Sequence, residues 1–253
     1  LQSEQNDYNK RDFGASMRFT VTIALCVCAS SAWAHKPYFS SGQYGAAEQA
    51  WAIENPDVSI VLYHKVTCDE PVVWLRYEVE EPTEIFVQLG VPLIDRLESY
   101  NPVIGVVHDG VSDGVSTPFA VPAGLGVEKY ESTGERSLFF EPFTQTQSWI
   151  LLERKVPVPA GVGYITAWDP NGQTGKLWVA VGETEEFTQD DWANAPNWLG
   201  DARFFHEAGS GPAVEPQGQL CAVVEPESCA VIQPSWGAAL LLVLLGVRRR
   251  RSN

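Results

Sequence analysis

Apolar and polar residues alternate along several short stretches of the chain. In residues 72–80 every second residue is apolar, and those predicted to face inward are Val73, Leu75, Tyr77 and Val79. The residues between them, predicted to face outward, are Trp74, Arg76, Glu78 and Glu80. Residues 84–91 repeat this period with Ile85, Val87, Leu89 and Val91. Such alternation is typical of antiparallel strands with one buried and one exposed face.

A longer stretch, residues 161–182, carries large apolar groups on both strand faces. It is interrupted by the sequence Asp-Pro-Asn-Gly at residues 169–172. Proline fixes φ, while asparagine and glycine tolerate positive φ, so this sequence favours a tight turn. We therefore expect two strands joined by this turn, lying centrally in a sheet that is covered on both sides.

Further apolar runs extend the pattern without a long amphipathic helix between them; they lie at residues 58–66, 103–107, 119–121, 137–140 and 149–153. Residues 95–100 suggest a short helical or looped excursion. Short strands with frequent turns predict an all-β fold, an antiparallel β-sandwich over residues 35–207. Thr188 and Asp191 form a capping-box pattern that opens a short C-terminal helical segment, which we expect Pro196 to interrupt.

The N-terminal region has the pattern of a secretory signal peptide. Met17 and Arg18 precede an apolar run, and the segment ends in Ala32-Trp33-Ala34. This arrangement predicts a signal peptide over residues 17–34, with cleavage after Ala34. Residues 1–16 are polar and are interpreted as an over-extended start.

The C-terminal region has the pattern of a membrane anchor. Residues 208–230 are rich in Gly, Pro and Glu and predict a flexible stalk. Residues 231–253 hold an apolar run followed by Arg248, Arg249, Arg250 and Arg251, which predicts a transmembrane helix whose arginine end is cytoplasmic. With Cys229 just upstream, the tail resembles the sorting tails of myxobacteria and related bacteria. That resemblance implies tail cleavage and transfer to the cell surface; the alternative is a plain tail anchor.

Cysteine usage fits an exported protein. Cys68, Cys221 and Cys229 remain after signal removal, and an oxidising compartment favours a disulfide. If sorting uses Cys229, then Cys68 pairs with Cys221; otherwise Cys221 and Cys229 close a small loop.

The formal net charge of −15 excludes some partners. An acidic surface repels nucleic acid and anionic lipid, so we expect no nucleic-acid partner. The expected partners are the membrane, through the C-terminal helix, and an envelope protein or glycan.

Two metals fit candidate ligands in the sequence. Signal cleavage would leave His35 at the N-terminus, where its amine and ring, with a second histidine, would form the histidine brace of copper proteins. His206, His64 and His108 are the candidate partners, and His206 is preferred. Oxygen ligands from Asp109 and Asp113, or from Asp169 and Asn171, would suit calcium, although turn formation explains the same residues.

Residues 141–149 form the candidate ligand site. Glu141, Phe143, Thr144, Thr146 and Trp149 place aromatic faces beside hydroxyls and a carboxylate, a combination that suits sugars or peptides. The alternative is a strand crossover whose hydroxyls satisfy the backbone. Residues 110–114 match G-x-S-x-G, but no helix follows to make a nucleophile elbow. No catalytic set is found, so a non-enzymatic role is preferred.

Several segments, among them 55–59, 86–92 and 141–149, resemble a group of exported, uncharacterised bacterial proteins. This likeness covers residues 47–205 and implies a sandwich related in style to bacterial pre-peptidase C-terminal domains. It implies no activity. The sequence therefore predicts an exported, anchored binding or structural module of the bacterial envelope, with a copper protein built on His35 as the alternative.

Overall fold

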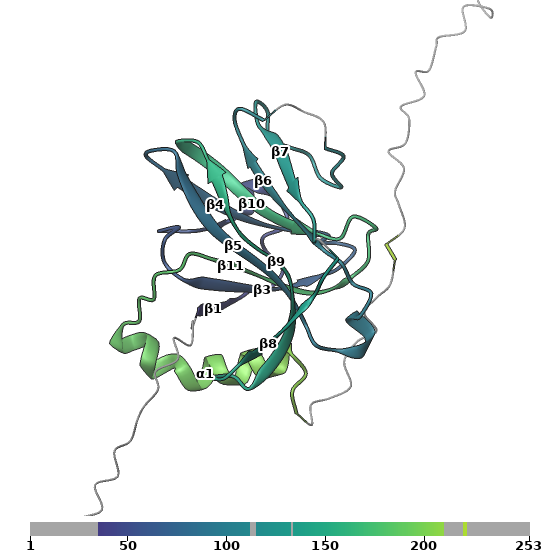
Figure 1. Cartoon of the computed structure of the whole chain (residues 1–253), viewed down its shortest axis with the longest axis vertical. Helices are drawn as coiled ribbons and strands as arrows, with labels where there is room; N and C mark the ends of the chain where they lie inside the picture. Colours follow the sequence, from purple (N-terminus) through teal and green to yellow (C-terminus); the bar gives the residue numbers. More distant parts are fainter. Residues whose placement is uncertain (1–34, 112–114, 133, 210–219, 222–253) are drawn as a thin grey trace, which may run out of the picture. The chain divides into compact units, whose positions relative to one another are not determined.

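The computed structural model describes residues 35–111, 115–132, 134–209 and 220–221 (Figure 1). The predicted signal peptide, the C-terminal tail with Cys229 and its four arginines, and most of the stalk lie outside these residues. So does Asp113, together with most of the G-x-S-x-G match.

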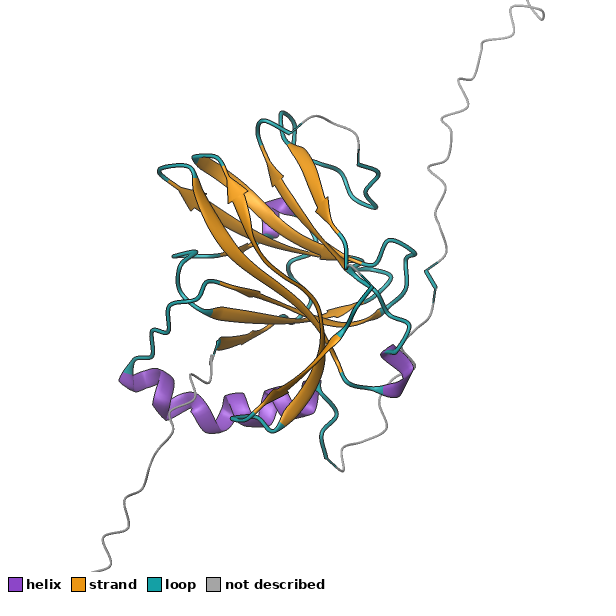
Figure 2. Ribbon diagram, viewed as in Figure 1, coloured by secondary structure: helices purple, strands orange, loops and turns teal. Residues whose placement is uncertain are grey.

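Two β-sheets form the body of the protein, and the prediction of an all-β, sandwich-like fold is confirmed (Figure 2). The six-stranded sheet has the order β1-β3-β11-β5-β9-β8. Its strands are β1 (Lys36–Phe39), β3 (Ile60–Val66), β11 (Gly175–Val181), β5 (Thr83–Pro92), β9 (Thr146–Val158) and β8 (Ser137–Glu141). The five-stranded sheet has the order β2-β4-β10-β6-β7. Its strands are β2 (Trp51–Ala52), β4 (Val72–Val79), β10 (Gly161–Trp168), β6 (Val103–His108) and β7 (Gly126–Tyr130).

The sandwich is not purely antiparallel. β1 pairs with β3 in parallel, and β2 pairs with β4 in parallel. Both are short edge strands, with 4 and 2 residues, and such short segments carry no readable alternation. The remaining strand pairs between named elements are antiparallel.

β10 and β11 lie in different sheets and do not pair with each other, so the expectation that both strands share one sheet is wrong. The turn itself is present: Gly172 donates its N–H to the Asp169 carbonyl at 3.0 Å. It carries the chain from the five-stranded sheet to the six-stranded one, and each strand lies inside its own sheet. The Asp169 carboxylate accepts hydrogen bonds from the N–H groups of Asn171 and Gln173 at 2.8 and 3.1 Å. These bonds support the turn interpretation of the proposed calcium ligands.

The main core lies between the sheets, and further apolar clusters cover their outer faces. On the five-stranded sheet, Trp74 was predicted to face outward to solvent, but it is 1% exposed. The segment that follows β6 folds over it, with the ring of Phe119 4.8 Å from that of Trp74. Residues 119–121 therefore form a covering loop, not the predicted strand.

The other outer face carries helix α1 (Gln189–Phe205), which lies beside β8 in Figure 1. Its predicted capping box is confirmed: Asp191 N–H donates to the Thr188 hydroxyl at 3.2 Å, and Thr188 N–H donates to the Asp191 carboxylate at 2.8 Å. The predicted interruption at Pro196 is wrong, because the helix runs through it. Proline removes one helical hydrogen bond, and packing against the sheet outweighs that loss. Two short 3-10 helices are η1 (Ala47–Gln49) and η2 (Asp95–Leu97), the second within the predicted excursion.

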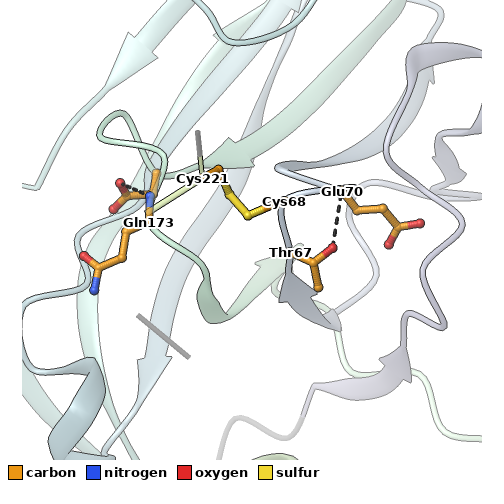
Figure 3. Close-up of a disulfide and its surroundings, with 6 residues drawn as sticks. Thr67, Cys68, Glu70, Gln173 and Cys221 are labelled. Atoms are coloured by element: carbon orange, nitrogen blue, oxygen red, sulfur yellow. Dashed lines mark hydrogen bonds between the residues drawn. A yellow bond between two sulfur atoms is a disulfide. The ribbon is translucent and has the colours of Figure 1, made fainter. Parts of the chain in front are cut away.

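A disulfide joins Cys68 to Cys221, with Cα atoms 5.3 Å apart (Figure 3). This is the first of the two pairings left open by the sequence. Cys68 lies between β3 and β4, beside a turn in which Glu70 N–H donates to the Thr67 hydroxyl at 3.1 Å. Cys221 N–H donates to the Gly172 carbonyl at 3.0 Å. The chain beyond α1 is thereby fastened to the body at two adjacent points.

Candidate functional site

A cavity of about 110 Å³ lies between helix α1 and the outer face of the six-stranded sheet. We call it the α1 cavity. Seven of the sixteen residues that line it are Phe, Tyr or Trp: Tyr63, Phe139, Phe143, Trp178, Phe187, Trp192 and Trp198. These side chains come from β3, β8, β11, the β8–β9 turn, and α1 with the segment before it. The site is therefore assembled from segments far apart in sequence.

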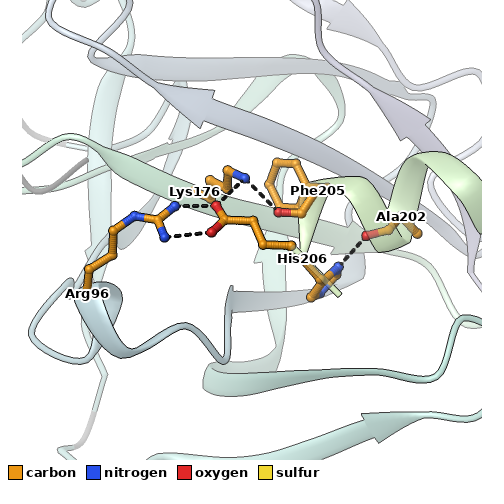
Figure 4. Close-up of polar contacts among 6 residues, drawn as sticks. Arg96, Lys176, Ala202, Phe205 and His206 are labelled. Atoms are coloured by element: carbon orange, nitrogen blue, oxygen red, sulfur yellow. Dashed lines mark hydrogen bonds and ion pairs between the residues drawn. The ribbon is translucent and has the colours of Figure 1, made fainter. Parts of the chain in front are cut away.

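A buried hydrogen-bond chain fixes the sheet wall against the helix. Trp178 Nε1 donates to the Ser148 hydroxyl at 3.0 Å, and that hydroxyl lies 3.0 Å from His206 Nε2. His206 Nδ1 lies 2.8 Å from the Ala202 carbonyl (Figure 4). A carbonyl only accepts, so Nδ1 carries the proton and Ser148 donates to Nε2. Burial lowers the pKa of His206 to about 4, so the ring is neutral at pH 7.

The C-terminal end of α1 is anchored by an ion-pair cluster, also shown in Figure 4. The Glu207 carboxylate accepts hydrogen bonds from Arg96 and from Lys176, the latter at 2.8 Å. Lys176 also donates to the Phe205 carbonyl at 2.9 Å. Burial opposes ionisation of Glu207, yet the bonds from Arg96 and Lys176 leave its pKa below the ordinary value. The cluster holds the helix end, and with it the His206 ring, on the sheet.

Two titratable groups complete the cavity wall. Burial raises the pKa of the Glu141 carboxyl, the nearby Glu185 adds to this, and the Phe143 N–H, donating to it at 2.9 Å, opposes it. His35 Nδ1 lies 2.5 Å from the Ser59 hydroxyl. Burial lowers the pKa of His35 to about 4, against an opposing effect of Glu185. At pH 7 both histidines in the wall are thus neutral.

Four of the predicted ligand residues meet in this cavity: Glu141, Phe143, Thr144 and Thr146 all line it. The hydroxyls of Thr144 and Thr146 hydrogen-bond to each other at 2.7 Å, and both residues are buried. Trp149 does not line the cavity. It packs on the main core, with the Arg136 guanidinium 5.6 Å from its ring centroid. Neighbouring residues on a strand face opposite ways, so Ser148 faces the cavity and Trp149 cannot.

The candidate copper ligands are divided. His35 and His206 both line the α1 cavity, but both ring nitrogens of His206 already have hydrogen-bond partners. His64 and His108 do not line it; their Nδ1 atoms contact the Ser40 hydroxyl at 3.0 Å and the Asp109 carbonyl at 2.5 Å. In the part of the chain that the structure describes, no group of three or more His, Cys, Asp or Glu side chains is arranged to hold a metal ion.

The helix side of the cavity was missed from sequence. Trp192, Ala195 and Trp198 recur every three residues and share one helix face. That spacing predicts one shared helix face, but the face spans Pro196, where the helix was expected to be interrupted. Tyr63 and Trp178 lie within nearly continuous apolar strands, so nothing local distinguished them from core residues.

No helix among the described residues is long and apolar enough to cross a membrane. No protein-family model matches the chain, and the search of curated proteins gives no match. The resemblance to exported sandwich proteins and to sorting tails therefore stays a prediction.

Proposed function

We propose that this protein is an exported, anchored β-sandwich module of the bacterial envelope that binds a small ligand in the α1 cavity. The observation that carries the proposal is the cavity itself: an aromatic wall with one carboxyl group, about 110 Å³ in volume. An apolar protein cavity of about 150 Å³ accommodates benzene. The expected ligand is therefore about the size of a single ring or a branched group of similar bulk.

The structure of the wall favours binding over a purely structural role. The chain from Trp178 through Ser148 to His206 holds the polar groups in fixed positions before any ligand arrives, and preorganisation reduces the entropic cost of binding. Trp192 and Phe143 are 63% and 45% exposed. Large aromatic side chains exposed together at a cavity mark interaction sites more often than isolated ones do.

Export and anchoring rest on the predicted signal peptide and tail. The disulfide between Cys68 and Cys221 supports this, because such bonds persist in oxidising compartments. The test is intact-mass spectrometry of the protein recovered from its own host. A chain that begins at His35 supports export; a chain that retains residues 17–34 contradicts it. The same spectrum shows whether the tail after Cys229 has been removed.

The binding site is tested by filling the cavity from the helix side. In Ala195→Leu, a larger side chain enters the α1 cavity at a position where leucine is a good helix former. We expect this variant to lose at least tenfold in affinity for small ring compounds, titrated by tryptophan fluorescence. Ala193→Leu is the matched control, because Ala193 is exposed on the same helix. Equal binding by both variants, or no binding by the wild type, would contradict the proposed site.

Copper binding remains the second candidate, because His35 and His206 line the same cavity. A copper ion bound there would have to replace at least one hydrogen bond to His206. The test is native mass spectrometry of the mature chain with added Cu(II). Retention of one copper by the wild type and its loss in His206→Ala would favour this function over the first.

A further inference from the structure

We propose that the α1 cavity selects a small organic cation with a methylated ammonium group. This inference rests on the proposed binding function and names its ligand class. It follows from three properties of the wall: its aromatic faces, its charge, and the state of its polar groups.

The aromatic faces supply the attraction. Each ring face carries partial negative charge, so a cation held against it is stabilised, by roughly 0.5–2 kcal/mol per ring depending on desolvation. Trp178 approaches from the sheet, Trp192 and Trp198 from the helix, and Phe143 from the β8–β9 turn. A ligand in the cavity therefore meets rings from several directions, as in the aromatic cages that hold quaternary ammonium groups.

The charge of the wall points to a cation. Glu141 lines the cavity, and Glu185 lies close enough to influence both Glu141 and His35. Within the described residues, no lysine or arginine lines the cavity. The cations next to the wall already have partners: Lys36 pairs with Asp191 at 2.8 Å and Lys176 with Glu207 at 2.8 Å. Arg203 donates to the Thr144 carbonyl at 3.1 Å. An anionic ligand would thus be buried beside a carboxyl group with no cation from the wall to neutralise it.

The polar groups of the wall favour a methylated ammonium over a primary one. Thr144 and Thr146 bond to each other, and Ser148 and His206 belong to the buried chain. A primary ammonium needs three hydrogen-bond acceptors when it leaves water, whereas a trimethylammonium group has no N–H to satisfy. Its compact, apolar surface also suits a cavity of about 110 Å³.

The experiment compares two probes of the same shape. Choline carries a trimethylammonium group, and 3,3-dimethylbutan-1-ol replaces its nitrogen with carbon, so the pair differs in charge. Both are titrated into the full mature protein by calorimetry and tryptophan fluorescence, with ethanolamine as the primary amine. We expect choline to bind at least tenfold more tightly than the other two.

Two substitutions of glutamate by glutamine test whether the Glu141 carboxylate is the group that attracts choline. Glu141→Gln removes the carboxylate with little change in volume, and we expect it to reduce choline affinity about tenfold while leaving the neutral probe unaffected. Glu135→Gln, at an exposed position ahead of β8, is the matched control and should leave both affinities unchanged. Ala195→Leu should abolish binding of both probes.

The outcomes separate the two proposals. If the neutral probe binds as tightly as choline, or if Glu141→Gln affects both isosteric probes equally, the selection of a cation is wrong while the binding function stands. If ethanolamine binds as tightly as choline, the preference for a methylated ammonium group is wrong, and again the binding function stands. If neither isostere binds but a neutral ring compound binds in an Ala195-dependent way, the inference again fails alone. If nothing binds to the wild type, both proposals fail.

Discussion

Ser148 links the sheet to the helix through one hydroxyl group. It accepts a hydrogen bond from Trp178 and donates one to His206, and all three residues are buried. A hydroxyl is the smallest side-chain group that both donates and accepts. Alanine or valine at this position would leave the Trp178 N–H without an acceptor and His206 Nε2 without a donor. Cysteine would offer only a weak thiol donor and acceptor to the same two groups.

Ser148→Ala should therefore lower the free energy of unfolding by about 2–4 kcal/mol, because it leaves a buried donor on Trp178 and a buried acceptor on His206 unpaired. Urea denaturation followed by fluorescence measures this change. Ser137→Ala, at an exposed position on β8, should cost less than about 0.5 kcal/mol. A similar small loss for Ser148→Ala would show that water replaces the hydroxyl.

Buried histidines predict the pH dependence of stability. Burial lowers the folded-state pKa of His35, His64 and His206 from 6.5 to about 4. Between these values the unfolded chain binds more protons, so acidification favours unfolding; above about pH 7.5 their effect vanishes. Each histidine should reduce stability by about 2 kcal/mol between pH 7 and pH 5.

Denaturant titrations between pH 8 and pH 5 measure this slope. His206→Gln removes one of the three titrating groups and should make the slope shallower, even though the variant is less stable at every pH. Stability that stays constant down to pH 5 would show that these rings are protonated in the folded protein.

Helix α1 is the element on which the cavity depends, and its first turn is held from two sides. The capping box joins Thr188 to Asp191, and Lys36 of β1 pairs with the same carboxylate at 2.8 Å. This couples the start of the helix to the edge of the six-stranded sheet.

Thr188→Ala should lower the free energy of unfolding by about 1 kcal/mol, since the Asp191 N–H loses its side-chain acceptor. Because the first turn carries Trp192, the affinity for a cavity ligand should fall as well. Thermal unfolding and ligand titration measure the two effects. Thr184→Ala, an exposed threonine just before the helix, serves as the control. A loss equal to that of the control would show that the Lys36 ion pair alone secures this turn.

The sequence pattern predicts which segments form strands better than it predicts the sheets that these strands join and the segments that cover them. The alternation in β4 and β5 identifies both strands, because alternation reports burial of one face. It cannot tell that Trp74, on the opposite face, is covered by a loop carrying Phe119. The turn at residues 169–172 is likewise correct as local chemistry, yet turn chemistry does not state which sheet the next strand joins. The cavity forms only when α1 packs on Tyr63 and Trp178. These contacts join segments far apart in the sequence, so local patterns do not predict them.

At the scale of the whole molecule, the Cys68–Cys221 disulfide closes a loop that includes the strands β4 to β11 and helix α1, with 153 residues of sequence separation. Cross-links that close long loops restrict the unfolded chain most. The double variant Cys68→Ser/Cys221→Ser should therefore lose roughly 3–5 kcal/mol of stability. Calorimetric unfolding of this variant, and of the wild type with reductant, measures the loss, and the two should agree. Unchanged unfolding in both would mean that the bond only fastens the chain after α1.

The same disulfide decides how the molecule responds to mechanical load. If the chain beyond Cys221 is held at a surface, tension on that tether passes through the sulfur atoms to the loop between β3 and β4. Helix α1 lies inside the closed loop and is bypassed. After reduction, in the described part of the chain, only the bridge between Gln173 and Leu220 and the hydrogen bond from Cys221 N–H to the Gly172 carbonyl would separate the tether from the end of α1 at Glu207. Thiol redox state would then set how much of the load on a stretched tether reaches the helix that forms one side of the cavity.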